Sequence, residues 1–305
     1  MSNALPRRKR LTPEHVKRAA DRAALRSEGK DPDDSPTDAG HRSNAGQRSA
    51  PAQRLSSSTT GWPISLSFLG LVGTLLGSAA AMLAFPTYAR WGVFPLVLAG
   101  WLVSLCLHEF GHAIVAYGCG DRSVRAKGYL TLDLVRYTHL QYSIVLPLVF
   151  LALGGIGLPG GAVYINRRAL RSRLRRSLVS AGGPAATLVV LLALLAILIV
   201  GRDRIEISLY AALAFLAFLQ LTTLIFNLIP VPGLDGWGII EPWLPRTLRE
   251  LGWRTARIAP LLLIVLLLVP PVNRAFWTGA DALCRSSGLD VWAISKGRAL
   301  FEFWR

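Results

Sequence analysis

The sequence predicts an all-α, polytopic membrane protein with about five to six transmembrane helices. Of its 305 residues, 52% are hydrophobic and only 17% are charged, whereas soluble chains carry roughly 25% charged residues. The apolar residues also gather in blocks of about 20 or more, the length at which a helix crosses a bilayer. These observations exclude a soluble globular enzyme. We expect five spans, at residues 63–85, 91–118, 178–200, 208–232 and 256–276.

The apolar segment 141–165 is a sixth block that is long enough to span. Its second half, however, is rich in residues that interrupt helices, namely Gly154, Gly155, Gly157, Pro159, Gly160 and Gly161. Such residues suit a broken path better than a straight helix, because proline lacks an amide hydrogen and glycine loses much entropy in a helix. We therefore predict a re-entrant element here.

The charges of the loops favour the same interpretation. If the N-terminal tail lies inside and 141–165 does not cross, the inner loops 119–140, 166–177 and 233–255 hold 13 lysines and arginines, and the outer loops hold 3. An excess of this kind on the cytoplasmic side follows the positive-inside rule. If 141–165 crossed, the arginine-rich loop 166–177 would lie outside. We expect a multi-pass protein of the cell membrane with a cytoplasmic N-terminus.

The two ends of the chain differ in composition from the transmembrane domain, residues 61–276. Residues 1–60 are polar and lack an apolar core, so we expect a disordered, basic cytoplasmic tail. The C-terminal tail, residues 277–305, is predicted to meet the membrane interface through Trp292, Phe301, Phe303 and Trp304. The net charge is +16, but most arginines lie in short loops as topology signals, so nucleic acid is not an expected partner.

The second predicted span contains His108-Glu109-Phe110-Gly111-His112. Positions i and i+4 of a helix share a face, so the two histidines can bind one metal ion. Glu109 then lies beside the metal, where it can take a proton from a bound water. The alternative is a chance polar patch between helices. An ionisable residue in a span costs about 3 kcal/mol on insertion scales, however, and usually marks function.

Two histidines leave a zinc site incomplete, and Asp235 is the candidate third ligand. It follows the fourth span, after Pro230 and Pro232 interrupt the helix. Irregular backbone at membrane depth is tolerated where it lines a cavity, although an aspartate in this setting can equally be a turn residue at the interface. In the predicted topology, spans 91–118 and 208–232 run in the same direction. Asp235 therefore lies at the cytoplasmic end, as the two histidines do.

Together, HEFGH and NLIPVPGLDG resemble the motifs of the site-2 protease family of intramembrane zinc metalloproteases. The resemblance covers the membrane core, residues 91–240. It implies that one zinc ion is bound by His108, His112 and Asp235 and that Glu109 is the catalytic base. It also implies a loop or β-hairpin after the HExxH helix, which agrees with the predicted re-entrant element.

The resemblance extends to residues that contact or align the substrate, which correspond to Asn227, Pro230 and Pro232. The family often has a GPxxN motif in the span between the two metal-bearing helices. This chain has Gly183-Pro184-Ala185-Ala186-Thr187 instead. Thr187 stands where the family has asparagine, and its hydroxyl can still hydrogen-bond although it cannot repeat the contacts of an amide.

The implied activity is proteolysis within the membrane, on single-span proteins such as anti-sigma factors. The alternative is an inactive or non-proteolytic zinc-binding adaptor of the same fold, but such proteins usually lack the glutamate or a ligand, and here all four positions are present. CAAX-type proteases also carry HExxH, but they need a downstream ExxxD motif that this sequence lacks. In the inner loop, Asp121 and Asp133 are expected only to interact with solvent.

Overall fold

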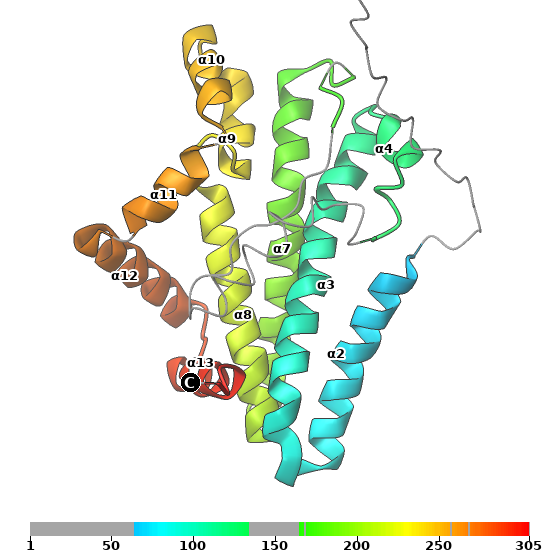
Figure 1. Ribbon diagram of the computed structural model, residues 1–305, viewed down its shortest axis with the longest axis vertical. Coiled ribbons are helices and arrows are strands. Elements are labelled where there is room, and N and C mark those ends of the chain that lie inside the picture. The colour runs from blue at the N-terminus through cyan, green and yellow to red at the C-terminus, as the bar shows by residue number, and fades with distance from the viewer. Residues whose placement is uncertain (1–63, 134–164, 168, 257, 268, 305) are drawn as a thin grey trace, which may run out of the picture. The chain divides into compact units, whose positions relative to one another are not determined.

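Four helices in the computed structural model are long and apolar enough to cross a membrane (Figure 1). The structure describes residues 64–133, 165–167, 169–256, 258–267 and 269–304. The four helices are α2 (Leu66–Ala84), α3 (Ala89–Gly118), α7 (Arg173–Gly201) and α8 (Ile207–Leu228). They confirm the first four predicted spans. A 3-10 turn, η1 (Pro86–Tyr88), joins α2 to α3.

Local sequence explains where these helices begin and end. Ser65, Ser172 and Glu206 each accept a hydrogen bond from the amide three residues later, so they cap α2, α7 and α8. The helix α8 ends at Leu228, four residues before the predicted limit. Ile229 is extended (φ −62°, ψ 130°), because a residue before proline, here Pro230, is disfavoured in the helical conformation.

The helices α3, α7 and α8 contact one another, and α2 packs on α3 (Figure 1). The helices differ widely in burial. In α8, 72% of the apolar 18-residue stretch is buried, whereas in α2 only 11% of such a stretch is buried. The shared core includes Val93, Leu96, Trp101, Leu216 and Leu219. The helix α8 is therefore the central element, whereas α2 exposes most of its apolar surface, as a lipid-facing helix does.

The chain beyond α8 forms shorter helices: α9 (Asp235–Ile240), η3 (Glu241–Trp243), α10 (Arg246–Thr255), α11 (Ala259–Leu267), α12 (Pro270–Ser286) and α13 (Val291–Phe301). The predicted fifth span, 256–276, is divided between α11 and α12. Pro270 begins α12 at a position that suits proline, because the first amide of a helix has no intrahelical partner. Among the described residues, the structure thus confirms four of the predicted five to six spans.

Among the described residues between α3 and α7 lies one short helix, α4 (Ser123–Ala126). No strand occurs among the described residues. The re-entrant or β-hairpin element predicted at 141–165 falls almost entirely on residues outside those described, so it stays a prediction.

The last helix, α13, packs across α8 and α3 rather than standing apart from them (Figure 1). Gly297 allows this contact, because a Cβ there would lie 2.0 Å from the carbonyl oxygen of Ala211. Phe301 is buried, and its ring lies 5.2 Å from that of Phe94. Trp292 and Phe303, in contrast, are 58% and 59% exposed. Phe301, one of the aromatic residues expected at the membrane interface, therefore packs in the protein core instead.

Candidate metal centre

The structure brings His108, His112 and Asp235 together. The helix α3 places the two histidines one turn apart on one face, and Asp235 is the first residue of α9. The Nε2 atoms of the two histidine rings are 3.2 Å apart. The Asp235 carboxylate lies 3.1 Å from Nε2 of His108 and 3.2 Å from Nε2 of His112. Three potential ligand atoms from two distant segments thus converge on one point.

These distances fit a zinc ion. Zinc binds nitrogen and carboxylate oxygen at about 2.0–2.1 Å, and tetrahedral geometry then separates two ligand atoms by roughly 3.3 Å. The two Nε2 atoms are 3.2 Å apart, and each lies 3.1 or 3.2 Å from a different oxygen of the Asp235 carboxylate, so each of these distances is within 0.2 Å of that separation. Both histidines are buried, at 6% and 7% exposure. Two imidazoles and one carboxylate leave a fourth position open, as in catalytic zinc sites.

Hydrogen bonds behind the histidines orient both rings. Nδ1 of His108 lies 2.9 Å from the hydroxyl oxygen of Thr187, and Nδ1 of His112 lies 2.8 Å from the carbonyl oxygen of Val179. A hydrogen on Nδ1 can be donated in each case, which leaves the Nε2 lone pair directed at the shared point. Second partners of this kind fix the tautomer and ring orientation of metal-binding histidines. The helix α7 supplies both partners.

Glycines let α7 approach the histidines closely. A Cβ on Gly183 would lie 2.3 Å from Nε2 of His112 and 2.5 Å from Nε2 of His108, so it would occupy the metal-binding position. One residue earlier, a Cβ on Gly182 would meet the carbonyl oxygen of Gly111 at 2.6 Å. The two helices therefore touch backbone to backbone, as small residues allow in membrane bundles.

Asp235 is positioned through contacts of the segment that follows it. The hydroxyl of Ser177 donates to the carbonyl oxygen of Ile239 (2.6 Å) and accepts from the indole nitrogen of Trp243 (2.9 Å). These bonds tie α9 and η3 to the start of α7. Asp235 can therefore offer its carboxylate to a metal ion that the two histidines share, and a carboxylate binds a metal in its ionised form.

The remaining predicted residues surround this centre. Glu109 is buried on α3, at 4% exposure, between the two histidines in the sequence. Asn227 is 3% exposed near the end of α8, and its side-chain nitrogen has no hydrogen-bond partner among the described residues. Pro230 and Pro232 lie in the turn that connects α8 to α9. Thr187 is fully enclosed, and its hydroxyl contacts the ring of His108.

The expectation for Asp121 is wrong. Asp121 is 1% exposed and accepts hydrogen bonds from the amide and hydroxyl of Ser123 (3.0 and 2.6 Å) and from the amide of Asn166 (2.7 Å). Burial raises the pKa of its carboxyl, but these hydrogen bonds lower it more, so the net shift is downward. The Asp-x-Ser spacing was a usable signal of a local turn. The contact with Asn166 is long-range and has no such signal.

Comparison with known proteins finds relatives over most of the chain. The chain is 48% identical over 242 residues to "Putative zinc metalloprotease Rip2" of Mycobacterium tuberculosis, covering 78% of this chain and 93% of that protein. The protein of the same name from Mycolicibacterium smegmatis is 43% identical over 246 residues, 79% of this chain and 94% of that protein. "Putative zinc metalloprotease YwhC" of Bacillus subtilis is 29% identical over 205 residues, 64% of this chain and 90% of that protein.

No family model and no solved structure matches the chain. The alignments nevertheless cover at least 90% of the length of each of these relatives, and the names of the relatives agree with the geometry. Zinc is the metal of these proteins by name, and the His/His/Asp group is arranged to bind a metal ion. Four helices are long and apolar enough to cross a membrane, and one of them, α3, carries both histidines. The chain belongs to the site-2 protease family of zinc metalloproteases.

Proposed function

We propose that this protein is a zinc-dependent intramembrane endopeptidase that hydrolyses peptide bonds within or near the transmembrane segments of membrane-anchored proteins. In this proposal His108, His112 and Asp235 hold one zinc ion, and Glu109 is the catalytic base. The observation that carries the proposal is the convergence of the three side chains within a protein of apolar helices: the two Nε2 atoms are 3.2 Å apart, and each lies 3.1 or 3.2 Å from one oxygen of the Asp235 carboxylate.

The chemistry divides between the metal and the side chains. Bound zinc polarises a carbonyl and lowers the pKa of a coordinated water. Glu109 accepts the proton of the attacking water and later delivers it to the leaving amine. Its burial, at 4% exposure, keeps bulk water from competing for that proton. Thr187 is a positioning residue in this scheme, because it acts on the reaction only through the ring of His108.

The depth of the centre supports cleavage inside the membrane. His108 lies ten residues before the end of α3 at Gly118, which corresponds to about 15 Å along a helix axis. A substrate must bring an extended segment to this depth, because the carbonyl of a helical peptide bond is already hydrogen-bonded and sterically shielded. Single-span proteins with locally weakened helices, such as anti-sigma factors, are therefore the substrates that we propose, in regulated intramembrane proteolysis.

The amide of Asn227 is suited to hold such an extended segment. It is buried near the turn that leads to Asp235, and its side-chain nitrogen lacks a partner among the described residues. A buried donor without a partner costs about 1–3 kcal/mol. A carbonyl of the substrate backbone would remove that cost. Pro230 and Pro232 contribute by keeping the adjacent turn out of the helical conformation.

The proposed orientation places the centre toward the cytoplasm. The guanidinium of Arg175, at the start of α7, donates to the carbonyl oxygen of Cys119, just after α3 (3.2 Å). The connection from α3 to α7 thus begins and ends on one side of the bundle, and its arginines favour the cytoplasmic side. In our proposal the N-terminal tail 1–60 is cytoplasmic, and residues 61–276 form the transmembrane protease domain.

The proposed activity is tested by cleavage of a single-span substrate by full-length protein in liposomes, with Glu109→Gln as the paired variant. We expect cleavage by the wild type alone, with equal zinc content in both proteins, because the glutamine keeps the shape of the side chain but cannot accept a proton. Equal cleavage by both proteins would contradict the role of Glu109. Absence of cleavage by both, with zinc bound, would favour the adaptor alternative.

The orientation is tested separately. Arg171 is exposed just before α7, so Arg171→Cys in a Cys119→Ser background offers an accessible thiol, while Cys106 and Cys284 are buried. We expect a membrane-impermeant maleimide to label this residue in inverted vesicles and not in intact cells. Labelling in intact cells would place the centre on the opposite side of the membrane.

A further inference from the structure

The short segment that precedes α7 contacts both sides of the metal centre. The backbone amide of Asn166 donates to the carboxylate of Asp121, just after α3 (2.7 Å). The guanidinium of the next residue, Arg167, donates to the carboxylate of Glu241, the first residue of η3 (2.9 Å). The helix α3 carries the two histidines, and η3 continues the helix that begins at Asp235. Two adjacent residues thus link the two elements that carry the predicted ligands.

Packing anchors this segment on the histidine side. Leu170 is 2% exposed and packs in one cluster with Ala116 of α3 and Val179 of α7. The carbonyl oxygen of Val179 is also the partner of Nδ1 of His112. The amide of Leu170 donates to the carbonyl oxygen of Arg167 (3.2 Å), which closes a turn. The side chain of Arg167 therefore extends from a backbone that is fixed to α3 and α7.

The carboxylate of Glu241 depends on Arg167 to balance its charge. Glu241 is 3% exposed, and one of its oxygens, Oε1, has no hydrogen-bond partner among the described residues. The other oxygen accepts from Arg167, whose side chain is 57% exposed. Loss of one partner of a buried ion pair leaves the other charge uncompensated, which is strongly destabilising. The pair is asymmetric in this respect, because Arg167 can turn to water and Glu241 cannot.

Asp235 and Glu241 stand at the two ends of one short helical segment. The 3-10 turn η3 follows α9 without a break. The amide of Glu241 donates to the carbonyl oxygen of Trp237, so the junction is itself hydrogen-bonded. The six residues of α9 correspond to about 9 Å along a helix axis. A constraint on Glu241 therefore limits how far Asp235 can shift or rotate.

The other contacts of this helical segment are of two kinds. A Cβ on Gly238 would lie 2.3 Å from the hydroxyl oxygen of Ser180, so α9 packs closely on α7 at this point. Close packing limits the approach of two helices, but dispersion contacts are individually weak and leave rotation open. The directed bonds are those of Ser177 with Ile239 and Trp243 and that of Arg167 with Glu241. The bond of Arg167 alone among these comes from outside α7.

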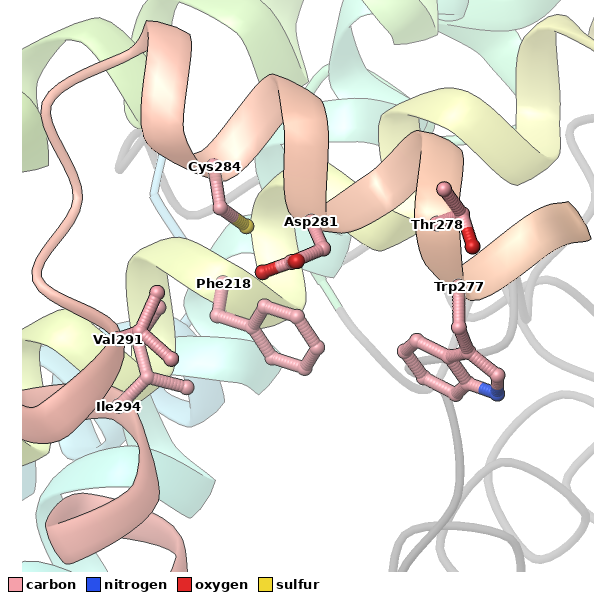
Figure 2. A pocket seen from close by; sticks show the side chains of 7 residues that line it. All are labelled: Phe218, Trp277, Thr278, Asp281, Cys284, Val291 and Ile294. Atoms are coloured by element: carbon pink, nitrogen blue, oxygen red, sulfur yellow. The ribbon is translucent and has the colours of Figure 1, made fainter. Parts of the chain in front are cut away.

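A second arginine ion pair shows the difference between a local pair and one that links two elements. Arg285 pairs with Asp281 at four-residue spacing within α12, and both side chains are partly exposed. Asp281 lines the pocket between α8, α12 and α13 (Figure 2). Exposed pairs within one helix contribute little to stability. Arg167 and Glu241, in contrast, are 74 positions apart in the sequence, and one of the two is buried.

We propose that Arg167 is a positioning residue for the third ligand. It holds Glu241, and through the α9–η3 segment it keeps Asp235 at the distance from α3 that a shared metal ion requires. Arg167 acts on the metal only through this segment and does not contact it. The inference rests on the proposed ligand set, His108, His112 and Asp235, and it adds the residue that couples the two sides of that set.

Zinc affinity of the full-length protein, measured by competition with a chelator, tests the proposal in two backgrounds. With Asp235 present, we expect Arg167→Gln to weaken zinc binding about fivefold, a typical coupling within one contact network. In an Asp235→Ala background the position of α9 no longer matters to the metal, so the same change should have no effect. Arg285→Gln breaks an ion pair inside α12 and should leave the affinity unchanged in both backgrounds.

Glu241→Gln provides a second variant in case Arg167→Gln does not fold. It removes the buried charge instead of leaving it without a partner, so the fold should tolerate it better. It also weakens the bond to Arg167, because a charge-assisted hydrogen bond becomes a neutral one. We expect a smaller loss of zinc affinity than in Arg167→Gln, again only where Asp235 is present.

An unchanged zinc affinity in Arg167→Gln would overturn the proposal. An equal loss in both backgrounds would overturn it as well, since the effect would then belong to the histidines or to the fold as a whole. If Asp235→Ala alone binds zinc as the wild type does, the ligand set is wrong and this inference fails with it. The readout is independent of proteolysis, so the proposed protease activity can fail while this proposal stands.

Discussion

The two sides of the metal centre are built in different ways. The histidine side consists of α3 and α7, two continuous helices in backbone contact at Gly111 and Gly182. The aspartate side consists of the turn after α8 and the six-residue helix α9, which begins at Asp235. On the first side helical geometry alone sets the ligand spacing. On the second side, the ligand is placed by tertiary contacts such as that of Ser177 with Ile239.

This difference has a physical consequence. A helix fixes side chains at i and i+4 through its own hydrogen bonds, so the histidine pair persists as long as α3 does. A turn with two prolines has few internal hydrogen bonds, and its position depends on its neighbours. We therefore expect changes on the histidine side that displace α7 or remove its hydrogen bonds to cost the most zinc affinity, and changes on the aspartate side to act in smaller steps. The following predictions sharpen this comparison.

The largest effect is expected for Gly183→Ala. The added methyl group would lie 2.3 and 2.5 Å from the two Nε2 atoms, so either α7 moves away or the metal position is filled. We expect zinc content, measured by elemental analysis of the purified protein, to fall to background. Gly77→Ala in α2 is the matched control, because nothing lies within 4 Å of its Cβ position. Full zinc content in Gly183→Ala would show that the histidine side is less rigid than its contacts imply.

The next effect is expected for Thr187→Val, which keeps the shape of the side chain but removes the hydroxyl that faces Nδ1 of His108 at 2.9 Å. Loss of such a partner typically weakens metal binding by about 10- to 100-fold. We expect this loss in a competition titration with a zinc chelator. Thr187→Ser retains the hydroxyl and should restore most of the affinity. If valine and serine behave alike, Thr187 acts by packing and not by orienting the ring.

The two sides of the metal centre also differ in how well they could be predicted from the sequence. The spacing of His108 and His112 determines their geometry within one helix, so the pair could be predicted from sequence. Asp235 required an argument about topology, because its turn and α3 are far apart in the chain. Gly183 belongs to the GPxxN-like motif, but its close approach to the histidines could not be predicted, since that depends on which residues of α3 face it. Likewise the span at 256–276 followed from hydropathy, while its division before Pro270 depends on local backbone chemistry that average hydropathy ignores.

A smaller effect is expected on the aspartate side from Ser177→Ala. This change removes the bonds of the Ser177 hydroxyl with Ile239 and Trp243, each worth about 1 kcal/mol. Only part of that loss reaches Asp235, so we expect zinc affinity to fall about fivefold in the same titration. Ser286→Ala, at an exposed hydroxyl on α12, should leave it unchanged. A loss as large as that of Thr187→Val would mean that the two sides depend equally on their supports.

The smallest effect is expected at Asp121, which ties the end of α3 to Asn166 ahead of α7. The pKa of its carboxyl is lowered in the folded protein, so its ionised form stabilises the fold at neutral pH and that stabilisation is lost as the pH falls through the folded value. Asp121→Asn should therefore unfold at a lower temperature at neutral pH, by the equivalent of about 1 kcal/mol. The difference from wild type should shrink in acid.

Thermal unfolding in detergent at neutral and acidic pH measures this difference directly. Protonation of other groups in acid affects both proteins equally, so it cancels in the difference. Asp203→Asn, at an exposed carboxylate in the turn after α7, serves as the control and should match wild type at both pH values. A difference that stays constant with pH would mean that Asp121 contributes through the shape of its turn. The histidine side would then owe nothing to the charge of Asp121 at the end of α3.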